Sequence, residues 1–137
     1  MEVTRVAAVI GGLLLLTSPL RAQSGDPKIA CAKASTTIEI NFCAEQDFKA
    51  ADARLNAAYK AMLGRVETGT DFDAKTKAGL RAAIQDAQRK WLAFRDADCK
   101  EAVGREWTGG TGMSYAVYSC LTEKTAARTR ELEARPH

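Results

Sequence analysis

The chain has 137 residues, with 20 Lys and Arg against 17 Asp and Glu, so its formal net charge is +3. This near balance excludes the strongly basic surface that nucleic-acid binding needs, and it gives no attraction to anionic membranes. A chain of this length forms one domain that can bury a core. The sole histidine is His137, which excludes a nucleophile paired with an internal histidine base.

The first residues have the pattern of a secretory signal peptide. Arg5 precedes an apolar run at residues 6–16, and Ala22 offers a small side chain for cleavage. We therefore expect residues 1–22 to be removed and residues 23–137 to form the mature domain, which is periplasmic or secreted. The alternative is an uncleaved anchor, but the apolar run is shorter than the roughly 20 residues that span a bilayer. We expect no stable membrane anchor after cleavage.

The four cysteines all lie in the expected mature domain. An even number of cysteines in an exported chain predicts disulfides, here two. A zinc site is the rival interpretation, but no Cys-x-x-Cys pair and no internal histidine is present. The glycine-rich run at residues 109–112 follows no strand and lacks the lysine of a phosphate-binding loop. We expect no cofactor, no metal and no catalytic residue.

Apolar side chains at helical spacing predict three helices. The first covers residues 37–66 and begins with a capping box, in which Thr36 and Glu39 satisfy each other's backbone. The second covers residues 73–103. Within it, apolar residues at 80, 84, 87, 91 and 94 share one face, and we expect the other helices to pack around this one. The third covers residues 114–134. The predicted core residues are Phe48, Leu55, Tyr59, Ile84, Trp91, Phe94 and Leu121.

We predict an all-α fold, a small three-helix antiparallel bundle stapled by two disulfides. Cys99 and Cys120 lie at equal depth in helices two and three, so we pair them. The polar segment before helix one can fold back and pair Cys31 with Cys43. The alternative connectivity joins Cys43 to Cys99 and Cys31 to Cys120.

Two features have both a structural and a functional interpretation. Asp52 and Asn56 are neighbours on helix one, and they form either a binding surface or a polar cluster that bonds across to helix two, with Gln88 as the suggested partner. Trp107, in the glycine-rich loop at residues 104–112, either covers the end of the bundle or projects as a contact, since Trp and Arg often anchor interfaces.

The cysteine spacing and several short motifs together resemble the lysozyme inhibitor LprI-like family of exported bacterial proteins. The residues that carry the resemblance are Cys31, Cys43, Asp52, Leu55, Asn56, Tyr59, Gln88, Trp91, Arg95, Cys99, Gly109, Gly110, Thr111, Cys120, Leu121, Thr122 and Arg128. The resemblance implies a small helical domain with paired cysteines and, from the family's name, inhibition of lysozyme. This chain lacks a lipobox, so a lipoprotein anchor is not implied.

Two functions follow as hypotheses, and neither is an enzyme. The first is a periplasmic or secreted protein that binds and blocks a host or competitor lysozyme. The second is a binding or scaffold module of the cell envelope with no lysozyme target. For the first, we expect the loop at residues 104–112 to enter the lysozyme cleft. The candidate partner-binding residues are Arg105, Glu106, Trp107, Gly109, Gly110 and Thr111.

Overall fold

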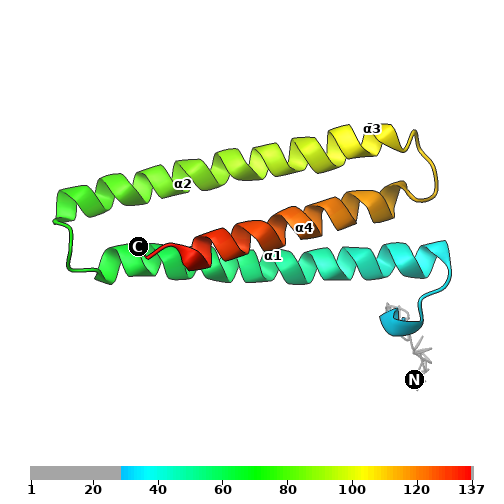
Figure 1. Ribbon diagram of the computed structural model, residues 1–137, viewed down its shortest axis with the longest axis horizontal. Coiled ribbons are helices and arrows are strands. Elements are labelled where there is room, and N and C mark those ends of the chain that lie inside the picture. Colours follow the sequence, from blue (N-terminus) through cyan, green and yellow to red (C-terminus); the bar gives the residue numbers. More distant parts are fainter. Residues whose placement is uncertain (1–28, 137) are drawn as a thin grey trace, which may run out of the picture.

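The computed structural model describes residues 29–136, which form helices and no strand. A short 3-10 helix, η1 (Cys31–Lys33), precedes the long helix α1 (Thr37–Thr68). Helix α2 (Ala74–Asp96) runs into a π-helical segment, η2 (Ala97–Val103), and a single turn, α3 (Gly104–Glu106). The last helix is α4 (Met113–Ala134). Figure 1 shows three long rods side by side, which confirms the predicted all-α antiparallel bundle.

The helix boundaries lie close to the predicted ones, with one informative difference. The backbone stays helical at Ala97 and at Gly104, so α2, η2 and α3 form one continuous rod. The predicted loop at 104–112 is therefore shortened to 107–112. The predicted signal peptide, residues 1–22, lies outside the described residues. No described helix has the length and the apolar character that crossing a membrane would require.

Local side-chain chemistry starts the first two long helices. The backbone N–H groups of Ser35 and Thr36 donate to the Glu39 carboxylate, each at 3.0 Å, and Glu39 N–H donates to Thr36 Oγ1 at 3.3 Å. These hydrogen bonds hold the pKa of Glu39 below its ordinary value, and the bond from the Ser35 backbone has the largest effect. Asp73 caps α2 by accepting from Thr76 N–H at 2.7 Å. The predicted capping box is confirmed.

The aliphatic core lies mainly between α1 and α4, which form the most extensive helix pair of the bundle. Its central cluster takes four residues from α1 but only Ile84 from α2 and Leu132 from α4. The buried residues of α2 are Ile84, Gln88 and Arg95, two of which are polar. The expectation that the other helices pack around helix two is therefore wrong.

The inner face of α2 is rotated from the face that hydrophobicity alone predicts. Gln88 and Arg95 are buried, whereas Ala87 and Phe94 are exposed. One position on a helix corresponds to about 100°, so this difference turns Phe94 away from the core. Phe94 is 57% exposed, and the Lys124 ammonium lies 5.0 Å from its ring centre. Its assignment to the core is wrong.

The other predicted core residues lie inside the bundle to different degrees. Leu55, Ile84 and Leu121 are buried. The aromatic residues Phe48, Tyr59 and Trp91 are half-buried. Tyr59 and Trp91 pack against the aliphatic cluster, and Phe48 lies beside the Arg95 guanidinium.

Both predicted disulfides are present in the described residues. Cys31 pairs with Cys43 and Cys99 pairs with Cys120, with Cα–Cα separations of 5.5 and 5.6 Å. The first ties η1 back onto α1. The second joins η2 to α4, with Cys99 fully buried. Both disulfides involve the end of the bundle where α1 begins and α3 ends, which we call the loop end (Figure 1).

Candidate functional site

The centre of the bundle holds a polar network built around Arg95 of α2, which is 6% exposed. Its guanidinium donates to Asp52 Oδ1 at 3.1 Å, to Asp96 Oδ1 at 2.9 Å and to Thr125 Oγ1 at 3.1 Å. The same group lies 5.3 Å from the Phe48 ring centre and 5.5 Å from that of Trp91. Arg95 thus bonds to both neighbouring helices.

A second arginine extends this network. The Arg128 guanidinium lies 5.7 Å from the Trp91 ring, and its Nε donates to Gln88 Oε1 at 3.1 Å. Its Nη1 donates to Glu131 at 2.8 Å. Trp91 therefore contacts two guanidinium groups, an arrangement that stabilises buried cations.

The network favours the structural interpretation of the Asp52 group. Asp52 accepts from Asn56 Nδ2 at 3.1 Å and from Arg95, so it does bond across to helix two. The suggested partner was wrong, because Gln88 bonds to Arg128 instead. These residues line neither of the two best-formed pockets found in the described part of the chain. We conclude that the network fixes how the helices pack.

The carboxylate of Asp96 carries a shifted pKa in this network. Partial burial acts to raise the pKa, but hydrogen bonds from Lys100 at 2.8 Å and from Arg95 outweigh it. The net effect holds the pKa of Asp96 below its ordinary value of 3.8. The charged form of Asp96 therefore stabilises the end of α2.

The loop predicted to bind a partner is exposed and compactly folded. Gly110 N–H donates to the Trp107 carbonyl at 2.8 Å, and Met113 N–H donates to the Gly110 carbonyl at 2.9 Å. Thr108 and Gly109 adopt positive φ values of 43° and 78°, the left-handed region that favours glycine. Consecutive turns therefore give this loop a defined shape.

Trp107 combines the two interpretations that its sequence position allows. A Cβ added at Gly112 would lie 2.5 Å from the Trp107 ring, so the ring packs directly on the Gly112 backbone. Even so, Trp107 is 46% exposed. Nearby, the Arg105 side chain is 82% exposed and only weakly paired with Glu101, at 3.6 Å. The structure thus presents an aromatic ring and a guanidinium at the loop end.

Sequence reasoning missed three exposed apolar side chains at the same end. Ile38 and Ile40 lie in the first turns of α1, and Tyr115 lies in the first turn of α4; all three are exposed. Together with Trp107 they give the loop end the character of an interaction surface. For Tyr115, the available signal was the absence of charged residues from Met113 to Thr122.

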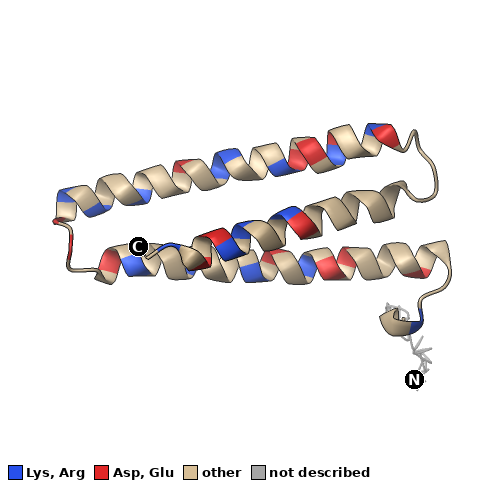
Figure 2. Ribbon diagram, in the orientation of Figure 1, with Lys and Arg blue, Asp and Glu red and all other residues tan. Residues whose placement is uncertain are grey.

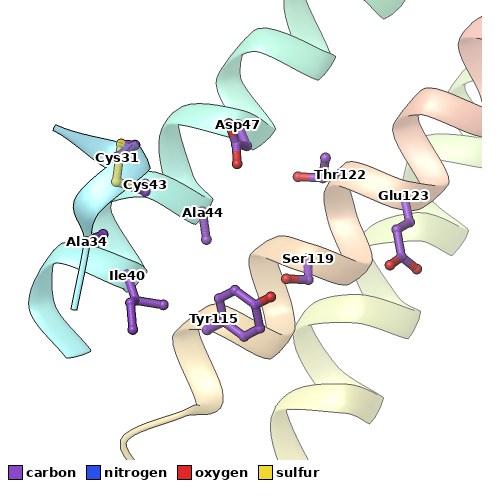
Figure 3. Close-up of a pocket in the computed structure, with 10 residues that line it drawn as sticks. All are labelled: Cys31, Ala34, Ile40, Cys43, Ala44, Asp47, Tyr115, Ser119, Thr122 and Glu123. Carbon is purple, nitrogen blue, oxygen red and sulfur yellow. A yellow bond between two sulfur atoms is a disulfide. The ribbon is translucent and has the colours of Figure 1, made fainter. Parts of the chain in front are cut away.

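A pocket of about 320 Å³ opens between η1, α1 and α4, and we call it the α1–α4 groove (Figure 3). The Tyr115 ring and the Ile40 side chain form its apolar wall, and the Ser119 hydroxyl points into the space beside Ala44. The lining residues are Cys31, Ala34, Ile40, Cys43, Ala44, Asp47, Tyr115, Ser119, Thr122 and Glu123.

Within residues 29–136, one group of side chains has the residue types of a metal site, formed by Asp98, Cys99 and Cys120. The two sulfurs are joined in a disulfide, and Asp98 pairs with Lys124 at 3.0 Å. A disulfide offers no thiolate to a metal, so this group is part of the structural staple.

The fold defines a small helical domain stapled by two disulfides. Comparison with known proteins specifies the family: a model described as "Lysozyme inhibitor LprI" matches residues 30–132. The chain belongs to the LprI lysozyme inhibitor family, a family of inhibitors rather than enzymes.

Two relatives share this similarity. "Uncharacterized protein R02472" of Rhizobium meliloti (strain 1021) is 38% identical over 131 residues, covering 93% of this chain and 91% of that protein. "Uncharacterized protein YecT" of Escherichia coli (strain K12) is 30% identical over 101 residues, covering 69% of this chain and 60% of that protein. No solved structure matches the chain.

Proposed function

We propose that this protein is an exported inhibitor that binds and blocks a lysozyme of a host or a competitor. Membership of the LprI family supports an inhibitor with a protein partner. Two disulfides are consistent with export to an oxidising compartment. The observation that carries the proposal is the braced loop that exposes Arg105 and Trp107 at the loop end.

The chemistry of the loop suits the cleft of a lysozyme. Such a cleft binds a sugar chain and contains two catalytic carboxyl groups. A guanidinium pairs with a carboxylate through two parallel hydrogen bonds, and Arg105 can exchange its weak contact with Glu101 for that pair. The exposed Trp107 ring would lie where a sugar ring stacks. A helical face is broader than this loop and enters a cleft less deeply.

The rigidity of the loop lowers the entropy lost on binding. The turns at Trp107 and Gly110 are closed by backbone hydrogen bonds, and the Trp107 ring is fixed against Gly112. The disulfide between Cys99 and Cys120 spans the base of the loop. A segment that is ordered before binding retains more of its contact energy as affinity.

The test is lysozyme activity on bacterial walls, followed by turbidity, with and without residues 23–137. The wild-type protein should slow clearing. The double variant Arg105→Ala, Trp107→Ala should slow it much less while keeping the wild-type circular dichroism spectrum. The matched control is Arg89→Ala with Phe94→Ala, which removes an exposed arginine and an exposed aromatic ring from α2.

Two outcomes would contradict the proposal at different levels. Full inhibition by the folded loop variant would exclude the loop as the contact surface. No inhibition by the wild-type protein, against lysozymes of each major class, would exclude the function and favour a cell-envelope binding or scaffold module.

A further inference from the structure

The charges of this chain are unevenly distributed although its net charge is only +3. Residues 34–48 contain the carboxylates of Glu39, Glu45 and Asp47 and no Lys or Arg. Residues 113–123 contain a single charged residue, Glu123. Figure 2 shows the first half of α4 without charged residues, whereas blue and red residues are interspersed along α2. The α1 and α4 surfaces at the loop end are therefore locally acidic.

The α1–α4 groove collects part of this acidity. Asp47 on α1 and Glu123 at the outer edge of α4 both line it (Figure 3), and neither belongs to the ion pairs of residues 29–136. The lysines that follow them are engaged elsewhere, since Lys49 pairs with Glu45 at 2.8 Å and Lys124 pairs with Asp98. No basic residue lines the groove. Two carboxylates thus remain available to a partner.

The other residues that line the groove provide an apolar surface and hydroxyl groups. Ile40, Ala44 and the Tyr115 ring provide an apolar wall, and the hydroxyls of Ser119 and Thr122 lie beyond it (Figure 3). A lysine or arginine side chain has the matching parts, a hydrocarbon stem that buries against apolar atoms and a cationic head that needs carboxylates. An anionic ligand would meet uncompensated negative charge here.

We propose that the α1–α4 groove binds a lysine or arginine side chain on the surface of a basic partner protein. With the partner taken as lysozyme, the inference rests on the proposed function. Lysozymes act on anionic cell walls and are commonly basic, so a chain with net charge +3 gains no overall attraction to them. A locally acidic groove supplies the complementarity that net charge does not, and it orients the loop end toward the enzyme.

The groove is tested with the double variant Asp47→Asn, Glu123→Gln. Both residues are exposed, so the variant should fold, as circular dichroism and thermal melting will verify. The matched control is Asp71→Asn with Glu133→Gln, which removes two exposed carboxylates from the opposite end of the bundle. Binding to a c-type lysozyme is measured by surface plasmon resonance at about 50 mM and about 300 mM salt.

We expect the groove variant to bind about tenfold more weakly at low salt, with a slower association rate and a smaller salt dependence. The control should stay within about twofold of the wild type at the same salt. Equal affinities of the groove variant and the wild type for lysozyme would overturn the proposal that the groove binds the partner, while leaving the proposed function intact.

A second measurement separates the groove from lysozyme altogether. The peptide acetyl-Gly-Arg-Gly-amide is titrated into the ¹⁵N-labelled protein, and acetyl-Gly-Gln-Gly-amide serves as the control. Backbone amide shifts should concentrate at residues 44–47 and 119–123 with the arginine peptide only, and they should vanish in the groove variant. If the wild-type protein binds no lysozyme, the proposed function fails, and this titration alone tests whether the groove binds a cationic side chain. Absent shifts, or equal shifts with both peptides, would overturn it.

Discussion

Replacing Arg95 by methionine tests whether the polar network holds the helices together. Methionine keeps an unbranched stem of similar length but removes the guanidinium. The change deletes hydrogen bonds to Asp52, Asp96 and Thr125, and it deletes the cation contacts with two aromatic rings. Because these partners lie on all three long helices, the loss affects the whole bundle.

The expected loss in the free energy of unfolding follows from how deeply the partners of Arg95 are buried. Removing one member of a buried ion pair typically costs about 3–5 kcal/mol, because the other charge stays buried and unpaired. Here the carboxylates of Asp52 and Asp96 are 37% and 39% exposed, so they regain water. We therefore expect a smaller loss of about 2–3 kcal/mol, which corresponds to a melting temperature lower by roughly 10 °C.

The assay is equilibrium unfolding in guanidinium chloride, followed by circular dichroism at about 222 nm. Arg89→Met is the matched control, since Arg89 is an exposed arginine of α2 that pairs with the exposed Asp86 of its own helix at 3.3 Å. This control should change the free energy of unfolding by less than about 0.5 kcal/mol. A double-mutant cycle of Arg95→Met with Asp52→Asn should give a coupling energy above about 0.5 kcal/mol. An Arg95→Met protein as stable as the control would refute the structural role of the network.

Three further predictions concern the disulfide, the loop and acid stability. Replacing Cys99 and Cys120 by serine should cost about 3 kcal/mol in a denaturant titration, since the disulfide closes a loop of sequence separation 21; an unchanged midpoint would contradict this. Gly112→Ala should displace the Trp107 ring, because its Cβ would lie 2.5 Å from that ring; tryptophan emission and inhibition should both change, whereas Gly64→Ala, with nothing within 4 Å, should leave inhibition unchanged. The pKa values of Asp96, Asp73 and Glu39 lie below their ordinary values of 3.8, 3.8 and 4.5. Their ionised forms therefore stabilise the fold above these values, and that contribution is lost as the pH falls through the lower folded-state pKa values. The melting temperature should fall as the pH is lowered through that acid range, and it should fall less in the Asp96→Asn variant. Identical dependence of the melting temperature on pH in the variant and the wild type would refute the assignment to Asp96.

The parts of the fold that depend on local sequence were predictable. Helix starts follow from Thr36 with Glu39 and from Asp73, whose side chains bond to backbone only three or four residues away. The disulfide between Cys99 and Cys120 follows because antiparallel helices place residues of equal depth side by side. The same register brings Trp91 beside Arg128.

The inner face of α2 was not predictable from hydrophobicity. The pattern assigns polar residues to solvent, yet Gln88 and Arg95 are buried because their partners are on other helices. The π-helical turn that follows Asp96 has no sequence signal either, since its backbone pairing depends on the surrounding packing.

The candidate site also has a part that was predictable from the sequence and a part that was not. The exposed loop follows from its glycines, which end one helix and permit the turn into the next. The α1–α4 groove required the structure, because η1 folds back through the Cys31–Cys43 disulfide and adds Ala34 to the residues of α1 and α4 that line the groove. Contacts between segments that lie far apart in the sequence leave no local pattern.

The residues of the polar network and the exposed charged residues proposed to bind a partner have different roles. Asp52, Arg95 and Arg128 bond to neighbouring helices, and the two arginines are buried, so these residues hold the helices of this bundle together. The exposed side chains of Arg105 and Asp47 take no part in that network. A network variant should therefore lose stability and binding together, whereas a loop or groove variant should lose binding alone. Measuring both quantities on each variant separates packing from recognition, which neither the family motif nor inhibition by itself can do.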